Sequence, residues 1–80
     1  MTTKIKCEIV EGFTPVEKIA RIKGADGKIE EVAVPVQSTT ANHLLAAEVG
    51  RQGDRVLVEL PRESASGRWR MWVKDSSIGG

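Results

Sequence analysis

Arg55-Val56-Leu57-Val58-Glu59-Leu60 and, after a polar loop, Gly67-Arg68-Trp69-Arg70-Met71-Trp72-Val73-Lys74 are the stretches that decide the fold of this 80-residue chain. Polar and apolar side chains alternate along both, as expected of strands that bury one face. The loop between them, residues 61–66, has a length that suits a hairpin. We therefore predict a C-terminal hairpin whose second strand turns Trp69, Met71 and Val73 inward, and on which the rest of the chain packs.

A chain of 80 residues forms one small domain, and its 40% hydrophobic and 29% charged residues are typical of a globular protein rather than a disordered one. The 12 basic and 11 acidic side chains nearly cancel, so nucleic-acid binding would require a local patch of positive charge. One cysteine and one histidine are too few for a closed zinc site or an intrachain disulfide, and we expect no metal or cofactor. No apolar segment has signal-peptide or membrane-spanning length, so we expect a cytoplasmic protein without a membrane partner.

Three strands are predicted in the first half of the chain. Residues 4–10 alternate cleanly, with Cys7 on the apolar face, where a small buried thiol fits better than a reactive one. Residues 16–23 and 28–36 form the next two strands, because Gly24-Ala25-Asp26-Gly27 between them supplies the positive φ values of a tight turn. Pro35 has no N–H group, so the third strand ends near it or lies at a sheet edge.

The segment 44–49 is open to two interpretations. Leu, Ala and Glu favour a helix, Gly50 stands where helices often end, and Ala41, Leu45 and Val49 would form one apolar stripe. We therefore predict a short helix over residues 44–49. The alternative is a further strand that pairs with the first strand of the C-terminal hairpin.

This order of elements, with one helix between the third and fourth of five strands, is the order in OB-folds, and SH3-like barrels are the near alternative. We predict a single mainly β domain over residues 1–80, with a flexible tail over residues 75–80. Its architecture would be a small five-stranded barrel or a curved antiparallel sheet. The predicted core consists of Ile5, Ile9, Ile22, Val32, Val34, Leu45, Val56, Val58, Trp69 and Met71.

No residue pattern predicts catalysis. His43 is the only histidine, and it stands among polar residues at the start of the predicted helix, where a solvated or capping role is favoured over that of a base. No two acidic residues are predicted to converge as a general acid and base. The turn at residues 24–27 lacks the length and the following Lys-Ser/Thr of a phosphate-binding loop. We therefore expect a binding module rather than an enzyme.

The candidate binding surface is the outward side of the last strand. If Trp69, Met71 and Val73 point inward, alternation turns Arg68, Arg70, Trp72 and Lys74 outward. An exposed indole among cations is suited to a protein interface or to single-stranded nucleic acid, and it is also compatible with a purely structural role in which the arginines pair with strand carboxylates. The leading hypothesis is protein–protein binding or self-association, and single-stranded nucleic-acid binding is the first alternative. The sequence does not require a dimer.

Two short motifs resemble the signature of PilZ domains. Arg51-Gln52-Gly53-Asp54-Arg55 has the form R-x-x-x-R, and Asp75-Ser76-Ser77-Ile78-Gly79-Gly80 has the form D-x-S-x-x-G. The resemblance implies a barrel that binds cyclic-di-GMP, with ligands at Arg51, Arg55, Asp75 and Ser77. In that family further strands follow the second motif, so that here the barrel would have to be completed from the N-terminal side.

Overall fold

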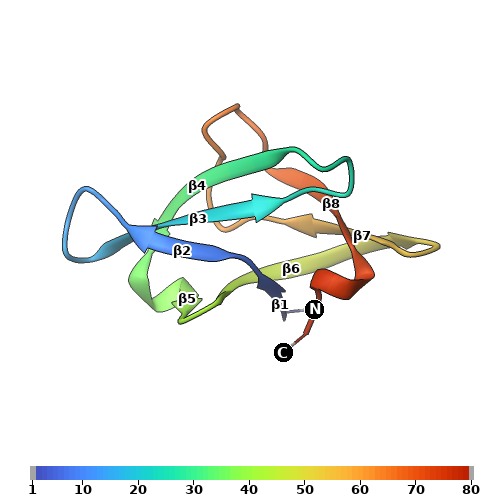
Figure 1. The fold of residues 1–80 in the computed structure, drawn as a ribbon, viewed down its shortest axis with the longest axis horizontal. Helices are drawn as coiled ribbons and strands as arrows, with labels where there is room; N and C mark the ends of the chain where they lie inside the picture. Colours follow the sequence, from blue (N-terminus) through green and yellow to red (C-terminus); the bar gives the residue numbers. More distant parts are fainter. Residues whose placement is uncertain (1, 80) are drawn as a thin grey trace.

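The computed structural model describes residues 2–79, which form two antiparallel sheets (Figure 1). Sheet A holds β1 (Thr2–Lys6), β6 (His43–Gln52), β7 (Arg55–Glu59) and β8 (Arg70–Lys74) in that order, with the short β5 (Thr39–Thr40) also paired to β6. Sheet B holds β2 (Glu8–Glu11), β3 (Glu17–Lys23) and β4 (Ile29–Pro35). Two single 3-10 turns, η1 (Val36–Ser38) and η2 (Asp75–Ser77), complete the described chain. Neither turn is a helix long enough to cross a membrane.

The two predicted hairpins are confirmed as β3–β4 and β7–β8. In the β3–β4 turn, the N–H of Gly27 donates to the carbonyl of Gly24 at 2.9 Å. Gly27 has a φ of 85°, a conformation that glycine adopts without steric cost. The mainly β character is therefore as predicted, although residues 2–79 form two separate sheets and no closed ring of strands among them is established.

The helix predicted over residues 44–49 is wrong, because this segment lies within β6. Leu44 and Ala46 are buried, whereas Leu45 and Ala47, which alternate with them, point to the other side of the sheet. The strand pairs with β1 along its first half and with β7 along its second, which satisfies backbone groups on both edges. Helix propensities differ by only tenths of a kcal/mol per residue, so this tertiary pairing outweighs them. The register with β7 shifts between Glu48 and Gly50, a β-bulge that leaves Val49 exposed.

The core lies between the two sheets and consists mainly of residues predicted for it. Ile5, Ile22, Val32, Val34, Val56, Val58 and Met71 are buried as expected. Ile9 and Leu45 are only partly buried. Trp69, however, has 55% of its surface exposed, because β8 begins at Arg70 and Trp69 belongs to the preceding loop. The inward placement of Trp69 was therefore wrong.

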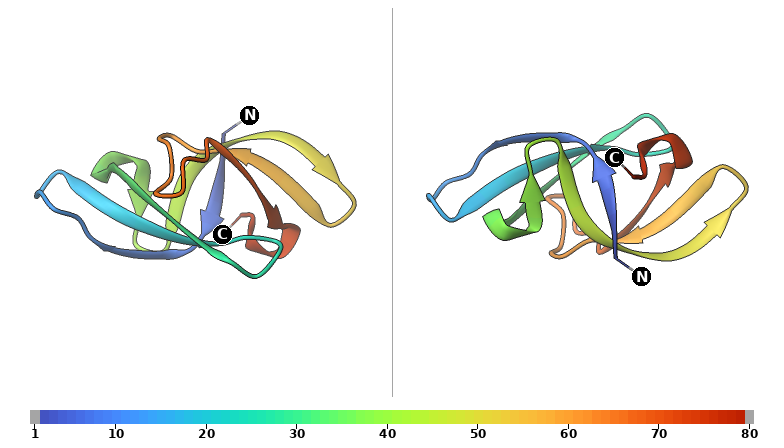
Figure 2. Two further views of the ribbon diagram at one scale, coloured as in Figure 1. Left: turned by 90° about the horizontal axis from the view of Figure 1, so that it is seen from above. Right: turned by 90° about the horizontal axis from the view of Figure 1, so that it is seen from below.

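Backbone hydrogen bonds join the two sheets at their edges. The N–H of Ala25, in the β3–β4 turn, donates to the carbonyl of Trp72 on β8 at 2.8 Å, and the N–H of Ala65 donates to the carbonyl of Glu31 on β4 at 2.7 Å. Figure 2 shows the two sheets from above and below. The β2–β3 and β6–β7 hairpins extend at opposite ends of the molecule.

The segment 75–80, expected to be a flexible tail, has regular structure through residue 78 and a further backbone hydrogen bond at residue 79. Asp75 begins the 3-10 turn η2, Ile78 forms a β-bridge with Ile5, and the N–H of Gly79 donates to the carbonyl of Lys4 at 2.9 Å. The apolar side chain of Ile78 packs on the core, which the polar composition of the segment does not suggest. Residue 80 lies outside the described residues.

Candidate functional site

Sheet A has one side packed on the core and one side that points away from sheet B. We call the second side the outer face of sheet A. The strand registers place there the residues that alternate with the buried ones. Its charged members are Lys4, Lys6, Arg55, Glu59, Arg70 and Lys74, and its apolar members include Leu45, Ala47, Leu57 and Trp72.

Trp72 lies on this face beside Leu57, its partner across the β7–β8 pair. The next strand places Gly50 opposite Leu57, and a Cβ atom at Gly50 would lie 3.5 Å from the Leu57 Cβ. Because Gly50 has no side chain, this end of the sheet leaves the Leu57–Trp72 pair accessible, and 37% of the Trp72 surface is exposed.

Trp69 reaches the same side of the molecule from the loop before β8. It lines a hollow together with Leu45 and Ala47 of β6 and Pro61 of the β7–β8 loop. Both indoles of the chain are therefore open to solvent at sheet A, although only Trp72 was predicted to be. The strand pattern missed Trp69 because alternation holds only within a paired strand.

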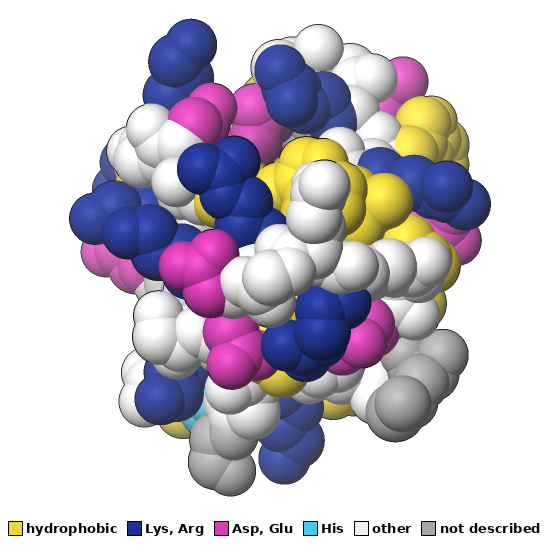
Figure 3. Space-filling model, turned by 90° about the vertical axis from the view of Figure 1, so that its right-hand side faces the viewer, with side chains coloured by type: hydrophobic (Ala, Val, Ile, Leu, Met, Phe, Trp, Pro, Cys, Tyr) yellow, Lys and Arg dark blue, Asp and Glu magenta, His cyan; other side chains and the backbone are white. Residues whose placement is uncertain are grey.

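Positive charge dominates the outer face of sheet A. It carries five of the 12 basic side chains of the chain and only one of the 11 acidic ones. Arg70 donates to Glu59 at 3.0 Å, whereas Lys4, Lys6, Arg55 and Lys74 form no ion pair with any residue from 2 to 79. Figure 3 views the molecule from the side of β8, η2 and the β6–β7 hairpin, and shows hydrophobic surface with Lys and Arg side chains beside it and Asp and Glu side chains interspersed.

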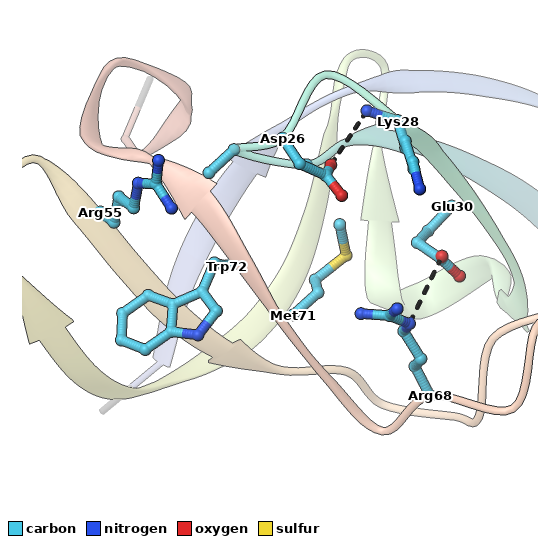
Figure 4. A pocket seen from close by; sticks show the side chains of 9 residues that line it. Asp26, Lys28, Glu30, Arg55, Arg68, Met71 and Trp72 are labelled. Carbon is cyan, nitrogen blue, oxygen red and sulfur yellow. Dashed lines mark hydrogen bonds and ion pairs between the residues drawn. The ribbon is translucent and has the colours of Figure 1, made fainter.

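The structure brings together three of the four predicted binding residues. Arg70, Trp72 and Lys74 lie on the outer face of sheet A, but Arg68 precedes β8 and turns toward β4. There its guanidinium Nε lies 3.8 Å from a carboxylate oxygen of Glu30 (Figure 4). Glu30 also accepts a hydrogen bond from the Ser66 hydroxyl at 2.6 Å, which, ahead of the charge of Arg68, holds the pKa of Glu30 below its usual value.

Sequence reasoning missed Arg55, Lys4 and Lys6 as members of this surface. Arg55 pairs with Lys74 across β7–β8 and lies diagonally to Trp72, with which it lines a common hollow (Figure 4). Lys4 and Lys6 belong to β1, which joins sheet A only through its pairing with β6. Alternation within each strand is visible in the sequence, but the registers that place these cations on one face are not.

The residues implied by the PilZ resemblance are only partly gathered. The Arg51 Nη1 lies 2.7 Å from the Asp75 Oδ1, and this hydrogen bond is the main reason why the pKa of Arg51 is raised. The Arg51 Nη2 also lies 3.5 Å from the Glu48 Oε1. Arg55, by contrast, points to the outer face of sheet A, the opposite side of the sheet from Arg51, because Arg51 pairs with Val56 and Arg55 with Gln52.

Cys7 is half-buried between β1 and β2, and burial raises its pKa to about 11 from 9.0. We therefore expect the native protein to react with a thiol reagent at pH 8 roughly a hundred times more slowly than the urea-unfolded chain, because the thiolate fraction falls tenfold per pKa unit. The same shift implies a contribution to stability that is complete below pH 9 and decreases as the pH rises from 9 through about 11. Equal rates in the native and unfolded states would contradict the burial.

Comparisons of the sequence with protein-family models, and of the chain with curated proteins and solved structures, gave no match.

Proposed function

We propose that this protein is a non-catalytic module that binds single-stranded nucleic acid on the outer face of sheet A. The observation that carries the proposal is the accessible indole of Trp72 beside Arg55 and Lys74, two cations unpaired within residues 2–79, on a sheet face that bears five basic side chains and one acidic one. Lys and Arg side chains neutralise phosphates, and a tryptophan offers a flat surface on which a base of any sequence can stack.

The charge of this face argues for an anionic partner over a second copy of the chain. In a two-fold symmetric dimer the same patch meets itself, so the excess cations of one copy would face those of the other. Juxtaposed like charges cost several kcal/mol. The hypothesis of self-association, which the exposed Trp72 favoured, would therefore require a different surface or a bound anion.

The proposed ligand is a single strand because stacking on Trp72 requires unpaired bases. In a duplex the flat surfaces of the bases are covered by their neighbours, and a protein contacts mainly phosphates and base edges. Trp69 adds a second accessible indole, three residues before Trp72 in the chain. Small curved β-sheets of the OB type bind single strands in this way, by aromatic stacking within a basic surface.

The test is fluorescence anisotropy of labelled 15-nucleotide DNA and RNA strands of mixed sequence, titrated with the protein at several salt concentrations. The four unpaired cations predict about four phosphate contacts, and hence a slope of log K against log salt of about −3, since each contact on a single strand contributes about −0.7. Arg55→Gln should make this slope shallower by about 0.7. Arg62→Gln, which removes the same charge from the β7–β8 loop, should leave it unchanged.

Two results would overturn the proposal. One is the absence of binding to either strand at low salt. The other is equal affinity for a duplex of the same sequence, which would indicate a surface that responds to phosphate charge alone. Sedimentation of the free protein shows whether an absence of binding reflects a dimer that covers the outer face of sheet A.

A further inference from the structure

A further hollow lies beside the outer face of sheet A, next to the β3–β4 turn. Residues 23–27 form one wall, and Lys74 with Ser76 and Ser77 of η2 forms the other. Its volume is about 440 Å³, within the usual range of ligand sites. The hollow on the other side of the same turn, lined by Trp72 and Arg55, has about 130 Å³.

Main-chain hydrogen bonds hold both walls in place. The bond of 2.8 Å from the N–H of Ala25 to the carbonyl of Trp72 joins the turn to β8. Lys23 and Lys74 each lie two residues from this bond, and both line the hollow. The N–H of Asp75 donates to the carbonyl of Asp54 at 2.7 Å, so η2 is anchored to the β6–β7 hairpin where its two serines line the hollow.

Four side chains that line this hollow carry hydrogen-bond donors without a partner among residues 2–79. Neither Lys23 nor Lys74 forms an ion pair with any described residue, and within residues 2–79 the hydroxyls of Ser76 and Ser77 have no hydrogen-bond partner. Asp26 also lines the hollow, but its Oδ1 accepts a hydrogen bond from the N–H of Lys28 at 3.0 Å. Figure 4 shows the Asp26 carboxylate turned toward Met71, on the side of the smaller hollow.

We propose that the larger of the two hollows beside the β3–β4 turn holds a phosphate group of the nucleic-acid strand whose bases stack on Trp72. Two ammonium groups and two hydroxyls form a donor set for a tetrahedral anion, and Lys74 belongs both to this hollow and to the outer face of sheet A. The inference rests on the proposed function, and it extends the contact surface beyond sheet A to Lys23 of sheet B. The phosphate is either an internal linkage or a terminal monoester.

Lys23→Gln tests the site. Lys18→Gln is the matched control, because Lys18 lies on the same strand β3, is paired with Glu11 and lines neither hollow beside the β3–β4 turn. In the anisotropy titration, Lys23→Gln should lower affinity about fivefold at 0.1 M salt and make the salt slope shallower by about 0.7, whereas Lys18→Gln should change neither to this extent. The double substitution Ser76→Ala with Ser77→Ala should lower affinity without changing the slope, since it removes donors but no charge. Circular dichroism and thermal unfolding establish that each variant is folded.

The outcomes separate this site from the proposed function. If Lys23→Gln binds as tightly as the wild type, or if Lys18→Gln loses as much affinity, the phosphate site is wrong while binding on sheet A stands. If the wild type binds no strand, both fall. Strands with and without a 5′- or 3′-phosphate identify the source: an effect of Lys23→Gln that requires the end group indicates a terminal monoester, and an effect that does not indicates an internal linkage.

Discussion

Trp72→Ala is expected to weaken the binding of single-stranded DNA or RNA by about 5- to 150-fold, because stacking of one base on an aromatic side chain contributes about 1–3 kcal/mol. Trp72 stands in the cationic part of sheet A, beside Leu57 and diagonal to Arg55, so a stacked base would bring its phosphates near Arg55 and Lys74. The salt slope should change little, since no charge is removed. Anisotropy titrations of wild type and variant at matched salt concentrations measure both quantities.

Two substitutions serve as controls for this result. Trp72→Phe keeps an aromatic surface and should retain most of the affinity. Phe13→Ala removes the most exposed aromatic side chain of the chain, which is 90% accessible. Phe13 lies at the tip of the β2–β3 hairpin, in sheet B rather than sheet A, so this substitution should leave binding unchanged. If Trp72→Ala binds normally while remaining folded, the indole has no part in recognition and the proposed mode of binding is wrong.

Leu44→Ala is expected to have the largest effect on stability. The Leu44 side chain is fully buried between the two sheets, and its strand β6 is central in sheet A, between β1 and β7. Truncation of a buried leucine costs about 2–5 kcal/mol, while a domain of this length has a total free energy of unfolding of about 4–12 kcal/mol. Urea denaturation followed by circular dichroism should therefore show a variant that is partly or wholly unfolded at 37 °C.

Leu45→Ala is the matched control, one residue further along the same strand. Leu45 is only half-buried on the outer face, and its truncation should cost about 1 kcal/mol or less. The pair also separates the two interpretations of the segment 44–49, because the helix predicted from the sequence would bury Leu45 with Ala41 and Val49. A larger loss from Leu45→Ala than from Leu44→Ala would contradict β6 as described.

The parts of the fold that the sequence predicts are those set by neighbouring residues. The turn sequence at residues 24–27 predicts the β3–β4 hairpin. Strict alternation from Arg70 to Lys74 predicts that Trp72 points away from the core. Along residues 44–47, by contrast, four consecutive apolar side chains carry no period of two, so helix and strand cannot be separated locally. Their strand state depends on pairing with β1, some forty residues earlier in the chain.

The candidate site was predictable to the same extent and for the same reason. Arg70, Trp72 and Lys74 share one strand, so their common direction follows from the pleat. Lys4, Lys6 and Arg55 join them only through the registers of β1 with β6 and of β7 with β8, which the net charge of +1 conceals. Arg68 was misplaced because β8 begins two residues after it, and the loop sends its side chain toward Glu30.

The hydrogen bonds that join the sheets have a further consequence for the addition of strands from other copies of this chain. An exposed sheet edge is a template on which another chain can add a strand, the first step of β-aggregation. Ala25 covers part of the β8 edge, Ala65 part of the β4 edge, and the segment at Ile78 and Gly79 part of the β1 edge. The fourth edge, β2, begins and ends with glutamates, whose charges discourage strand addition. Deletions in the β7–β8 loop would therefore be expected to promote fibril formation by uncovering β4, even where the core remains intact.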